Sequence, residues 1–277
     1  MDRLDALALM RVSVVIPTLD EAERIGRCVE SCGAGDGMEV DVVVVDGGSR
    51  DGTCEAAESA CTRLMRDAGG KGGGRVCGCR VVRGKERGRG LQMRQGVEDT
   101  AGDAVVLLHG DSELPPDWAG SMSRALGRGG WGAFRLAVQD DEERRGGGAS
   151  LGLGMSVVEW WANAVRVGMI GLPYGDQGMF MRREVLEAVG GVPGQPFLED
   201  LELSLRLRRA AGWPMVADGG PVRTSGRRFA TLGALRTAAI NQATVLAYLA
   251  GVDAATLGKW YRAQVPRAQA PRGKPSS

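Results

Sequence analysis

The chain has 277 residues, of which 43% are hydrophobic and 25% are charged, and its formal net charge is +1. This length and apolar content suit one sizeable α/β domain of a water-soluble protein. The near-neutral charge excludes a protein that relies on a global positive field to bind nucleic acid or an anionic membrane.

Six cysteines are present, and Met1–Arg11 carries two acidic residues and no long apolar core. No secretory signal is therefore expected, and a cytoplasmic protein with reduced thiols is the prediction. Cys77 and Cys79 are separated by one residue, which is not the spacing of a zinc knuckle, and no partner pair follows them. We expect no metal at these cysteines.

The first part of the chain alternates short β-branched runs with helical patterns. Strands are predicted at 12–16 and 40–45, each followed by a polar loop and a helix. Asp20 or Thr18 is placed to cap the first helix and Asp51 the second.

Residues 67–79 are rich in glycine and predict a solvated insertion. A short strand is expected to resume at 80–83, and a helix that starts near Leu91 ends near Gly102.

The run from Ala104 to Leu108 is apolar throughout and stops at His109-Gly110-Asp111. Such a run is typical of a strand that is buried on both faces of a parallel sheet. Because ligands of open α/β sheets bind outside the carboxyl ends of the strands, His109 and Asp111 are candidate ligands of a divalent cation that holds a diphosphate. The alternative is a plain turn in which Asp111 or Ser112 caps the next helix.

The second half continues the alternation of strands and helices. Its predicted elements are a helix after Pro115-Pro116, a strand over 132–138, a surface loop over 139–148, a turn-rich loop over 171–178, a strand over 179–181, a helix opened by Glu199-Asp200 and a last strand near 214–217. The pattern favours one α/β domain over residues 1–265, followed by a disordered tail at 266–277.

Two long apolar segments, 151–172 and 231–252, contain polar residues and are not expected to span a membrane. In the first segment, one helical face carries Val157, Trp160, Trp161, Ala164 and Gly168, and the other carries Glu159, Asn163 and Arg166. Packing on the core is the expected arrangement, and peripheral contact with a membrane surface is the alternative.

Charged residues recur at one predicted edge of the sheet. They are Asp20, Asp46, Asp111, Asp176, Glu199, Asp200 and the basic pairs Arg87/Arg89 and Arg227/Arg228. Carboxylates alone would repel one another, whereas a cation, a diphosphate and arginines would balance them. The loop after the first strand, Pro17–Glu21, is not a dinucleotide fingerprint, and the absence of a P-loop motif excludes a P-loop ATPase or GTPase.

Seven blocks in order carry a family resemblance. They are SVVIPTLDEAERIGRCVES, VVVVDGGSRDGT, GRGLQMRQG, VVLLHGDSELPPDW, GLPYGDQGMFMRRE, FLEDLELSLRLRR and VRTSGRRF, within residues 12–262. Together they resemble glycosyltransferase family 2, and most closely its branch of radical-SAM/selenodomain-associated transferases. The resemblance implies the GT-A type nucleotide-diphospho-sugar transferase fold, a single α/β domain with a mixed, mostly parallel central sheet.

The resemblance also implies roles for single positions. Those that match nucleotide-sugar binding are Pro17, Thr18, Asp20, Glu21, Asp46, Gly47, Arg89, Gln92, Arg227 and Arg228, and those that match the acceptor or donor sugar are Gly175, Asp176 and Gln177. Asp200, with Glu199 beside it, matches the acidic pair that supplies the catalytic base. Asp111 matches the last carboxylate of an Asp-x-Asp metal motif, and His109 stands in the place of the first. Arg94 departs from the branch, which usually has Asn at that position.

These roles imply a glycosyltransferase that moves a sugar from a nucleotide-diphosphate donor to an acceptor with inversion, assisted by a divalent cation, Mn²⁺ or Mg²⁺. Because imidazole suits a softer ion, His109 favours Mn²⁺. The acceptor, whether a lipid, a protein or a small metabolite, stays open, and no nucleic acid partner is expected. The alternatives are a nucleotidyltransferase that forms a nucleotide-sugar and a non-catalytic nucleotide-sugar-binding protein.

Overall fold

The structure is a computed structural model that describes residues 10–33, 35, 37–66, 74–139 and 152–265. In these residues, one sheet of eight strands has the order β3-β2-β1-β4-β7-β6-β8-β5. The strands are β1 (Arg11–Thr18), β2 (Glu39–Asp46), β3 (Arg75–Arg83), β4 (Ala104–Leu107), β5 (Ser112–Glu113), β6 (Trp131–Gln139), β7 (Met179–Arg182) and β8 (Met215–Ser225). Strands β1–β4 are parallel to one another, β7 is antiparallel to β4 and β6, β6 and β8 are parallel, and β5 is antiparallel to β8.

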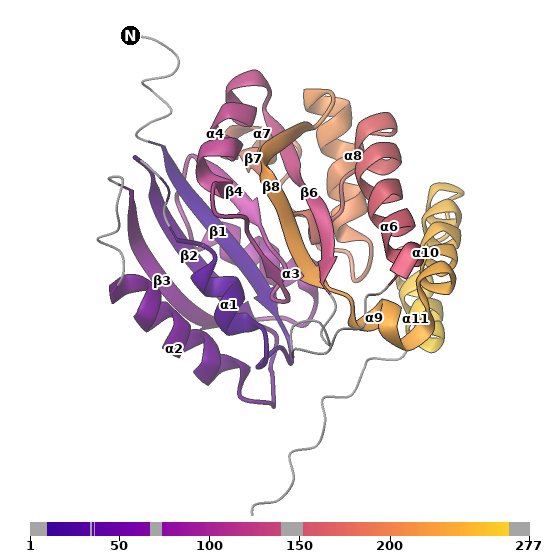
Figure 1. Ribbon diagram of the computed structural model, residues 1–277, viewed down its shortest axis with the longest axis horizontal. Coiled ribbons are helices and arrows are strands. Elements are labelled where there is room, and N and C mark those ends of the chain that lie inside the picture. The colour runs from indigo at the N-terminus through magenta and orange to yellow at the C-terminus, as the bar shows by residue number, and fades with distance from the viewer. Residues whose placement is uncertain (1–9, 34, 36, 67–73, 140–151, 266–277) are drawn as a thin grey trace, which may run out of the picture.

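The helices cover both faces of this sheet. They are α1 (Ile25–Glu30), α2 (Thr53–Arg66), α3 (Arg89–Glu98), α4 (Trp118–Arg128), α6 (Gly152–Trp160), the π-helix η1 (Trp161–Met169), the 3-10 turn η2 (Gly175–Gln177), α7 (Arg183–Ala188), α8 (Glu199–Ala211), α9 (Arg227–Leu232), α10 (Ala234–Leu249) and α11 (Ala254–Gln264). Figure 1 shows α1 and α2 in front of the strands β1–β3, and the helices α6, α10 and α11 together at the opposite end of the sheet.

The central strands are apolar throughout because alternate side chains point to opposite faces of the sheet and both faces are covered by helices. In β1, Val14 and Ile16 pack with α1, α2 and α4, whereas Val15 faces the layer that contains α3, α7 and α8. Strands β2 and β4 divide their side chains between the same two layers. The predicted mixed, mostly parallel sheet is confirmed.

The strand β3 begins earlier than the sequence pattern predicted. Residues 75–79 pair with β2, so the prediction of a solvated insertion is wrong for them, while 67–73 lie outside the described residues. The physical reason is that β2 offers a full-length edge, and pairing with it outweighs the low strand propensity of Gly78.

Strand β3 also carries a disulfide partner. Cys79 is bonded to Cys61 of α2, with Cα atoms 5.2 Å apart, a separation that a disulfide spans readily. The expectation of reduced thiols is therefore wrong for this pair, whereas Cys28, Cys32, Cys54 and Cys77 are free.

The predicted cap of the first helix is wrong, and so is the alternative in which Ser112 caps the helix after 109–111. Helix α1 has Arg24 at its N-cap with no side-chain hydrogen bond, because Asp20 is bound to the neighbouring loop instead. Ser112 lies in strand β5 and caps no helix, and α4 begins only at Trp118. Asp51 does accept a hydrogen bond from the Thr53 amide at the start of α2, as predicted.

Several predictions fall on other parts of the chain. The tail at 266–277 and most of the surface loop at 139–148 lie outside the described residues, and the domain range 1–265 stays a prediction. Among the described helices, none is long and apolar enough to cross a membrane.

Candidate active site

The carboxyl ends of the parallel strands bring the predicted residues to one edge of the sheet. Thr18 at the end of β1 is in register with Asp46 at the end of β2, and Pro17 with Val45. His109 follows β4, which is the other neighbour of β1. This is the edge at which open α/β sheets bind ligands.

Two loops at this edge are bound to each other by hydrogen bonds. The backbone amide of Asp20 donates to Ser49 Oγ at 2.9 Å, and that of Glu21 donates to Thr53 Oγ1 at 2.8 Å. The buried carboxylate of Asp46 accepts hydrogen bonds from the Gly48 and Ser49 amides and from the Ser49 hydroxyl. Asp46 thereby fixes the shape of the loop that follows β2.

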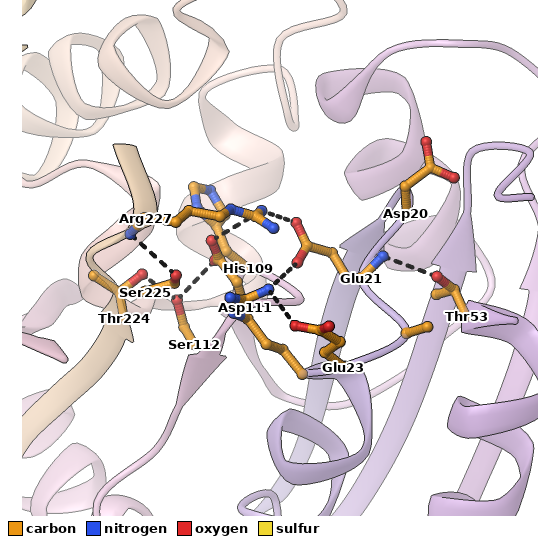
Figure 2. Close-up of polar contacts among 12 residues, drawn as sticks. Asp20, Glu21, Glu23, Thr53, His109, Asp111, Ser112, Thr224, Ser225 and Arg227 are labelled. Carbon is orange, nitrogen blue, oxygen red and sulfur yellow. Dashed lines mark hydrogen bonds and ion pairs between the residues drawn. The ribbon is translucent and has the colours of Figure 1, made fainter. Parts of the chain in front are cut away.

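Asp20 is turned away from the other carboxylates of the edge, as Figure 2 shows. Its backbone is left-handed, with φ of 55°, and its Oδ1 accepts a hydrogen bond from the Arg50 amide at 3.0 Å. Its contacts are therefore with the 46–53 loop.

Gln92 of α3 holds the ends of the first two strands together. Its side-chain nitrogen donates to the carbonyls of Thr18 at 2.9 Å and Val45 at 2.7 Å, and the side chain is buried. A β-carbon on Gly47 would lie 3.0 Å from this amide, so glycine permits the close packing. Gln92 and Gly47 therefore support the ends of β1 and β2 from the buried side of the site.

Glu21, Asp111 and Arg227 form a compact charged group. The Arg227 guanidinium donates to Glu21 Oε1 and lies 3.5 Å from Asp111 Oδ2, and Figure 2 shows the three side chains pointing toward one another. Burial raises the pKa of Glu21, against the lowering effect of Arg227. Arg24 adds a second cation, 3.9 Å from Glu21 Oε2.

The short strand β5, which the sequence pattern did not predict, accounts for the position of Arg227 beside Asp111. Ser112 of β5 pairs with Thr224 of β8, and their hydroxyls are 3.0 Å apart. Because β5 directly follows Asp111, the pairing brings the end of β8, and Arg227 beyond it, next to the carboxylate.

His109 lies deeper in the site, against the loop that contains Gly175. Its Nε2 atom is buried and has no hydrogen-bond partner among the described residues. Burial and the nearby Arg89 lower the pKa of His109 to about 4, so the imidazole is neutral at physiological pH. A β-carbon on Gly175 would lie 2.3 Å from Nε2, which explains why this position is glycine.

Asp200 and Glu199 open helix α8 but have different surroundings. The Glu199 side chain is 2% exposed and binds the Arg89 guanidinium. The Asp200 side chain is 12% exposed and accepts hydrogen bonds from the amides of Gly175 at 3.1 Å and Leu201 at 2.8 Å. Although burial alone would raise it, the pKa of Asp200 is lowered, because Arg89 and these amides stabilise the carboxylate.

The sequence analysis missed Arg166 and Tyr174 as site residues. Arg166 of η1 donates to Asp176 Oδ1 at 3.1 Å and to Gln177 Oε1, and it lies 3.9 Å from the centroid of the Tyr174 ring. Gln177 is buried, and its side-chain nitrogen donates a hydrogen bond to the Phe134 carbonyl at 3.3 Å. The sequence did contain an indication of this role for Arg166, because the residue belongs to the polar face of an otherwise apolar helix.

The guanidinium of Arg94 does not join the charged group. Arg94, the departure from the family pattern, donates through Nε and Nη2 to the Val192 carbonyl, so its guanidinium serves packing between α3 and the loop before α8. The side chain of Arg228 lies outside the described part of the chain, and its role stays a prediction.

The candidate metal ligands suit a cation whose coordination is mostly completed by groups that do not belong to the protein. Among the described residues, no group of three His, Cys, Asp or Glu side chains could hold a metal ion alone. His109 nevertheless offers a neutral, unpartnered nitrogen, and Asp111 offers a carboxylate two residues away. A nitrogen–oxygen pair of this kind fits a cation such as Mn²⁺ that is completed by phosphate oxygens and water.

Comparisons with solved structures identify the fold. A crystal structure of S. aureus TarS matches with a TM-score of 0.53 at 16% identity, over 79% of this chain and 61% of that chain. A second TarS structure, described as a complex with UDP-GlcNAc, has a TM-score of 0.52 at 15% identity and covers 78% of this chain and 58% of that chain. The predicted GT-A type fold is confirmed.

Sequence comparisons identify the family. A dolichol-phosphate mannosyltransferase of Pyrococcus furiosus is 27% identical over 43% of this chain and 31% of its own length. An undecaprenyl-phosphate 4-deoxy-4-formamido-L-arabinose transferase of Edwardsiella ictaluri is 29% identical over 51% of this chain and 42% of its own length. The chain thus matches less than half of each curated relative. The model of glycosyl transferase family 2 matches residues 13–190, and the chain belongs to that family.

Proposed function

We propose that this chain transfers a sugar from a nucleotide-diphosphate donor to an acceptor hydroxyl group, with inversion at the anomeric carbon. The observation that carries this proposal is the placement of Asp200. Its ionised carboxylate lies at the N-terminus of α8, beside His109 and Arg89, at the same sheet edge as Asp111 and Arg227. A base and a cationic group for a leaving diphosphate are what such a transfer requires.

The donor is proposed to lie along the edge formed by β1, β2 and β4. Pro17, Thr18 and Glu21, with the loop held by Asp46, offer backbone and side-chain groups for a base and ribose. The structural neighbour TarS is described in complexes with UDP and UDP-GlcNAc, which supports a nucleoside-diphosphate sugar as the donor class.

Asp200 is proposed to act as the general base. It accepts the proton of the acceptor group, the acceptor oxygen attacks the anomeric carbon, and the bond from that carbon to the diphosphate oxygen breaks. Direct displacement places the new bond opposite the old one, which gives inversion. Arg227 stabilises the negative charge that develops on the leaving diphosphate. Gly175, Asp176 and Gln177 form the wall nearest to Asp200 and are proposed to contact the sugar or the acceptor.

A divalent cation would be held by Asp111 and His109, together with the diphosphate. When bound, it would neutralise charge on the leaving group. Membership in the radical-SAM/selenodomain-associated branch is part of the proposal and rests on the seven sequence blocks.

The first test is a thermal-shift screen of the purified protein with UDP-, GDP- and dTDP-sugars, each with and without Mn²⁺ or Mg²⁺. At least one donor class is expected to raise the unfolding temperature, and to do so more strongly with a cation, because ligands that bind only the folded state stabilise it. Asp111→Ala is expected to lose the effect of the cation. Asp218→Ala is the matched control, because Asp218 lies on the exposed surface and pairs with Arg124. No shift with any nucleotide sugar would contradict the proposal.

A further inference from the structure

The surface helix formed by α6 and η1 buries Met155, Ala162 and Val167 but turns several large apolar side chains outward. Val157 is 53% exposed, Trp160 61% and Met169 73%. The polar face packs inward, where Glu159 accepts a hydrogen bond from the Val138 amide at 2.6 Å. Asn163 accepts a hydrogen bond from the Leu136 amide and donates one to the Leu136 carbonyl. Helices on a protein surface usually bury the apolar side, so this orientation requires another explanation.

Helix α10 also turns large apolar side chains outward. Its outward stripe is formed by Leu235, Ala239, Ala243, Leu246 and Leu249, which recur at spacings of three and four residues, and Leu235 and Leu246 are 72% and 66% exposed. Its inward face carries Thr237 and Thr244, whose hydroxyls are satisfied by the carbonyls of Gly233 and Ile240. The helix is firmly held in this orientation by Val245 and Tyr248, which pack with Leu172 and Leu201.

These helices are neighbours at one end of the molecule. Helix α10 contacts both α6 and α11, and Figure 1 shows these three helices together at the end of the molecule that is opposite to β3 and α2. Helix α11 adds Trp260, which is 42% exposed, and two exposed cations, Lys259 and Arg262. We refer to the exposed faces of α6–η1, α10 and α11 as the C-terminal helical surface.

The charge of this region is one-sided although the whole chain is nearly neutral. Between residues 234 and 264, which form α10 and α11, the sequence has three Lys or Arg residues, Arg236, Lys259 and Arg262, and a single acidic residue, Asp253. Leucine and tryptophan on an outward face, with cations beside them, are the composition of a helix that lies in a membrane interface. A second copy of this chain would bring the same positive charges, whereas an anionic lipid surface complements them.

We infer that the C-terminal helical surface docks this protein on an anionic lipid surface. The tryptophans would lie at headgroup level, the leucine stripe would enter the acyl boundary, and Lys259 and Arg262 would contact lipid phosphates. Helix α9 connects this surface directly to Arg227, so docking would hold the candidate active site close to the membrane. The inference does not require the proposed sugar transfer, because docking depends on side chains outside that site.

Sedimentation with phospholipid vesicles tests the inference. The protein is expected to co-sediment with vesicles that contain phosphatidylglycerol, and less with phosphatidylcholine alone or at high salt, because the cations contribute to binding. The double variant Trp160→Gln/Leu246→Gln is expected to lower the partition coefficient by roughly tenfold or more, since it removes two large apolar side chains from the contact. Lys259→Gln/Arg262→Gln is expected to remove most of the preference for anionic lipid.

Met65→Gln is the matched control, because Met65 is 41% exposed on α2, away from this surface. Its partition coefficient is expected to equal that of the wild type. Circular dichroism and a denaturant melt establish that each variant is folded. The inference is overturned if the wild type does not bind anionic vesicles, if all variants bind equally, or if the surface proves to be buried in a dimer that ignores lipid.

Discussion

At the scale of single residues, Glu199 and Asp200 are neighbours in sequence with different surroundings, and this difference is the basis for proposing Asp200 as the proton acceptor. Glu199 is buried against Arg89, and removing its charge would leave that guanidinium with less compensation. Asp200 is the more exposed of the two and lies beside Gly175. We therefore propose separate tasks for the two neighbours, the first in positioning Arg89 and the second in proton transfer.

Asp200→Asn is expected to lower donor turnover by about 10²–10⁴-fold, the usual effect of losing an acid–base group. The measurement is release of nucleoside diphosphate from the donor that the thermal-shift screen identifies. Donor affinity should change little, because the amide oxygen of the variant can still accept a hydrogen bond from one of the two backbone amides, Gly175 or Leu201, that bind the carboxylate. Normal turnover in Asp200→Asn, with an inactive Glu199→Gln, would reverse the assignment.

Gly175→Ala is expected to destabilise the protein by roughly 1–3 kcal/mol, the usual cost of inserting a methyl group into a tightly packed site. The reason is that the new β-carbon would lie 2.3 Å from His109 Nε2. Urea unfolding measures the effect. Adding His109→Ala should recover part of the loss, and Gly33→Ala, whose nearest contact is 3.8 Å, is the matched control. Equal costs for the two glycine variants would refute the contact.

The chain contains a single histidine, so the state of His109 can be observed directly. Its proton NMR titration is expected to give a pKa of about 4, below the ordinary 6.5, because burial and Arg89 disfavour the imidazolium. The folded state then binds fewer protons than the unfolded state between these values. Stability is therefore full above pH 6.5 and falls as the pH drops toward 4.

His109→Gln should remove that part of the pH dependence of the unfolding free energy. An imidazole that titrates near its ordinary pKa would contradict the buried environment described for the folded protein.

Residue types at strand ends were the most predictable part of the site. Asp111 and Asp46 follow apolar runs, and Asp200 begins a helix with strong periodicity, so their placement followed from the sequence. Arg166 was missed because its role depends on which way a surface helix turns, and the hydrophobic pattern alone predicted the opposite orientation. The seven blocks assigned Asp111 and Arg227 to the same site, which no local rule supplies, whereas their direct contact is seen only in the structure.

At the scale of elements, strands with long β-branched runs were predictable and the short or glycine-rich ones were not. Strand β5 has two residues, Ser112 and Glu113, and exists because β8 is available to pair with it. The first part of β3 likewise forms on an edge that only the folded sheet provides. Tertiary pairing therefore determines these segments, and propensity has little influence on them.

The link between α2 and β3 gives an element-scale prediction. Thiol titration of the unreduced, denatured protein should find four free cysteines, and six after reduction. Reduction is expected to lower the free energy of unfolding by about 3 kcal/mol, because the Cys61–Cys79 bond closes a loop of moderate length. Cys54→Ser is the control, since Cys54 is free and its loss should leave the effect of reduction unchanged. Six free thiols before reduction would show that the bond is absent.

At the scale of the whole molecule, the alternation of strands and helices predicted one α/β domain, and the family resemblance implied a mixed sheet, but neither predicted the order of the strands. The placement of β7 between β4 and β6, and of β8 beyond β6, depends on pairings between segments far apart in sequence. This order brings together two halves of the candidate site, the edge of β1, β2 and β4 that is proposed to bind the nucleotide and Arg227, which follows β8. The exposure of large apolar side chains on α6 and α10 is likewise a property of the assembled molecule.

The central claim is that a cation and a nucleotide-sugar bind together at the sheet edge that contains Asp111. Calorimetric titration with the donor from the screen tests it in the wild type, Asp111→Ala and Asp200→Asn. Because Asp111 and His109 supply few ligands, the cation alone should bind weakly and the cation with the donor strongly. Asp111→Ala should abolish this coupling, and Asp200→Asn should retain it. Equal donor binding with and without divalent ions, in the wild type and Asp111→Ala alike, would contradict the claim and leave His109–Asp111 as an ordinary turn.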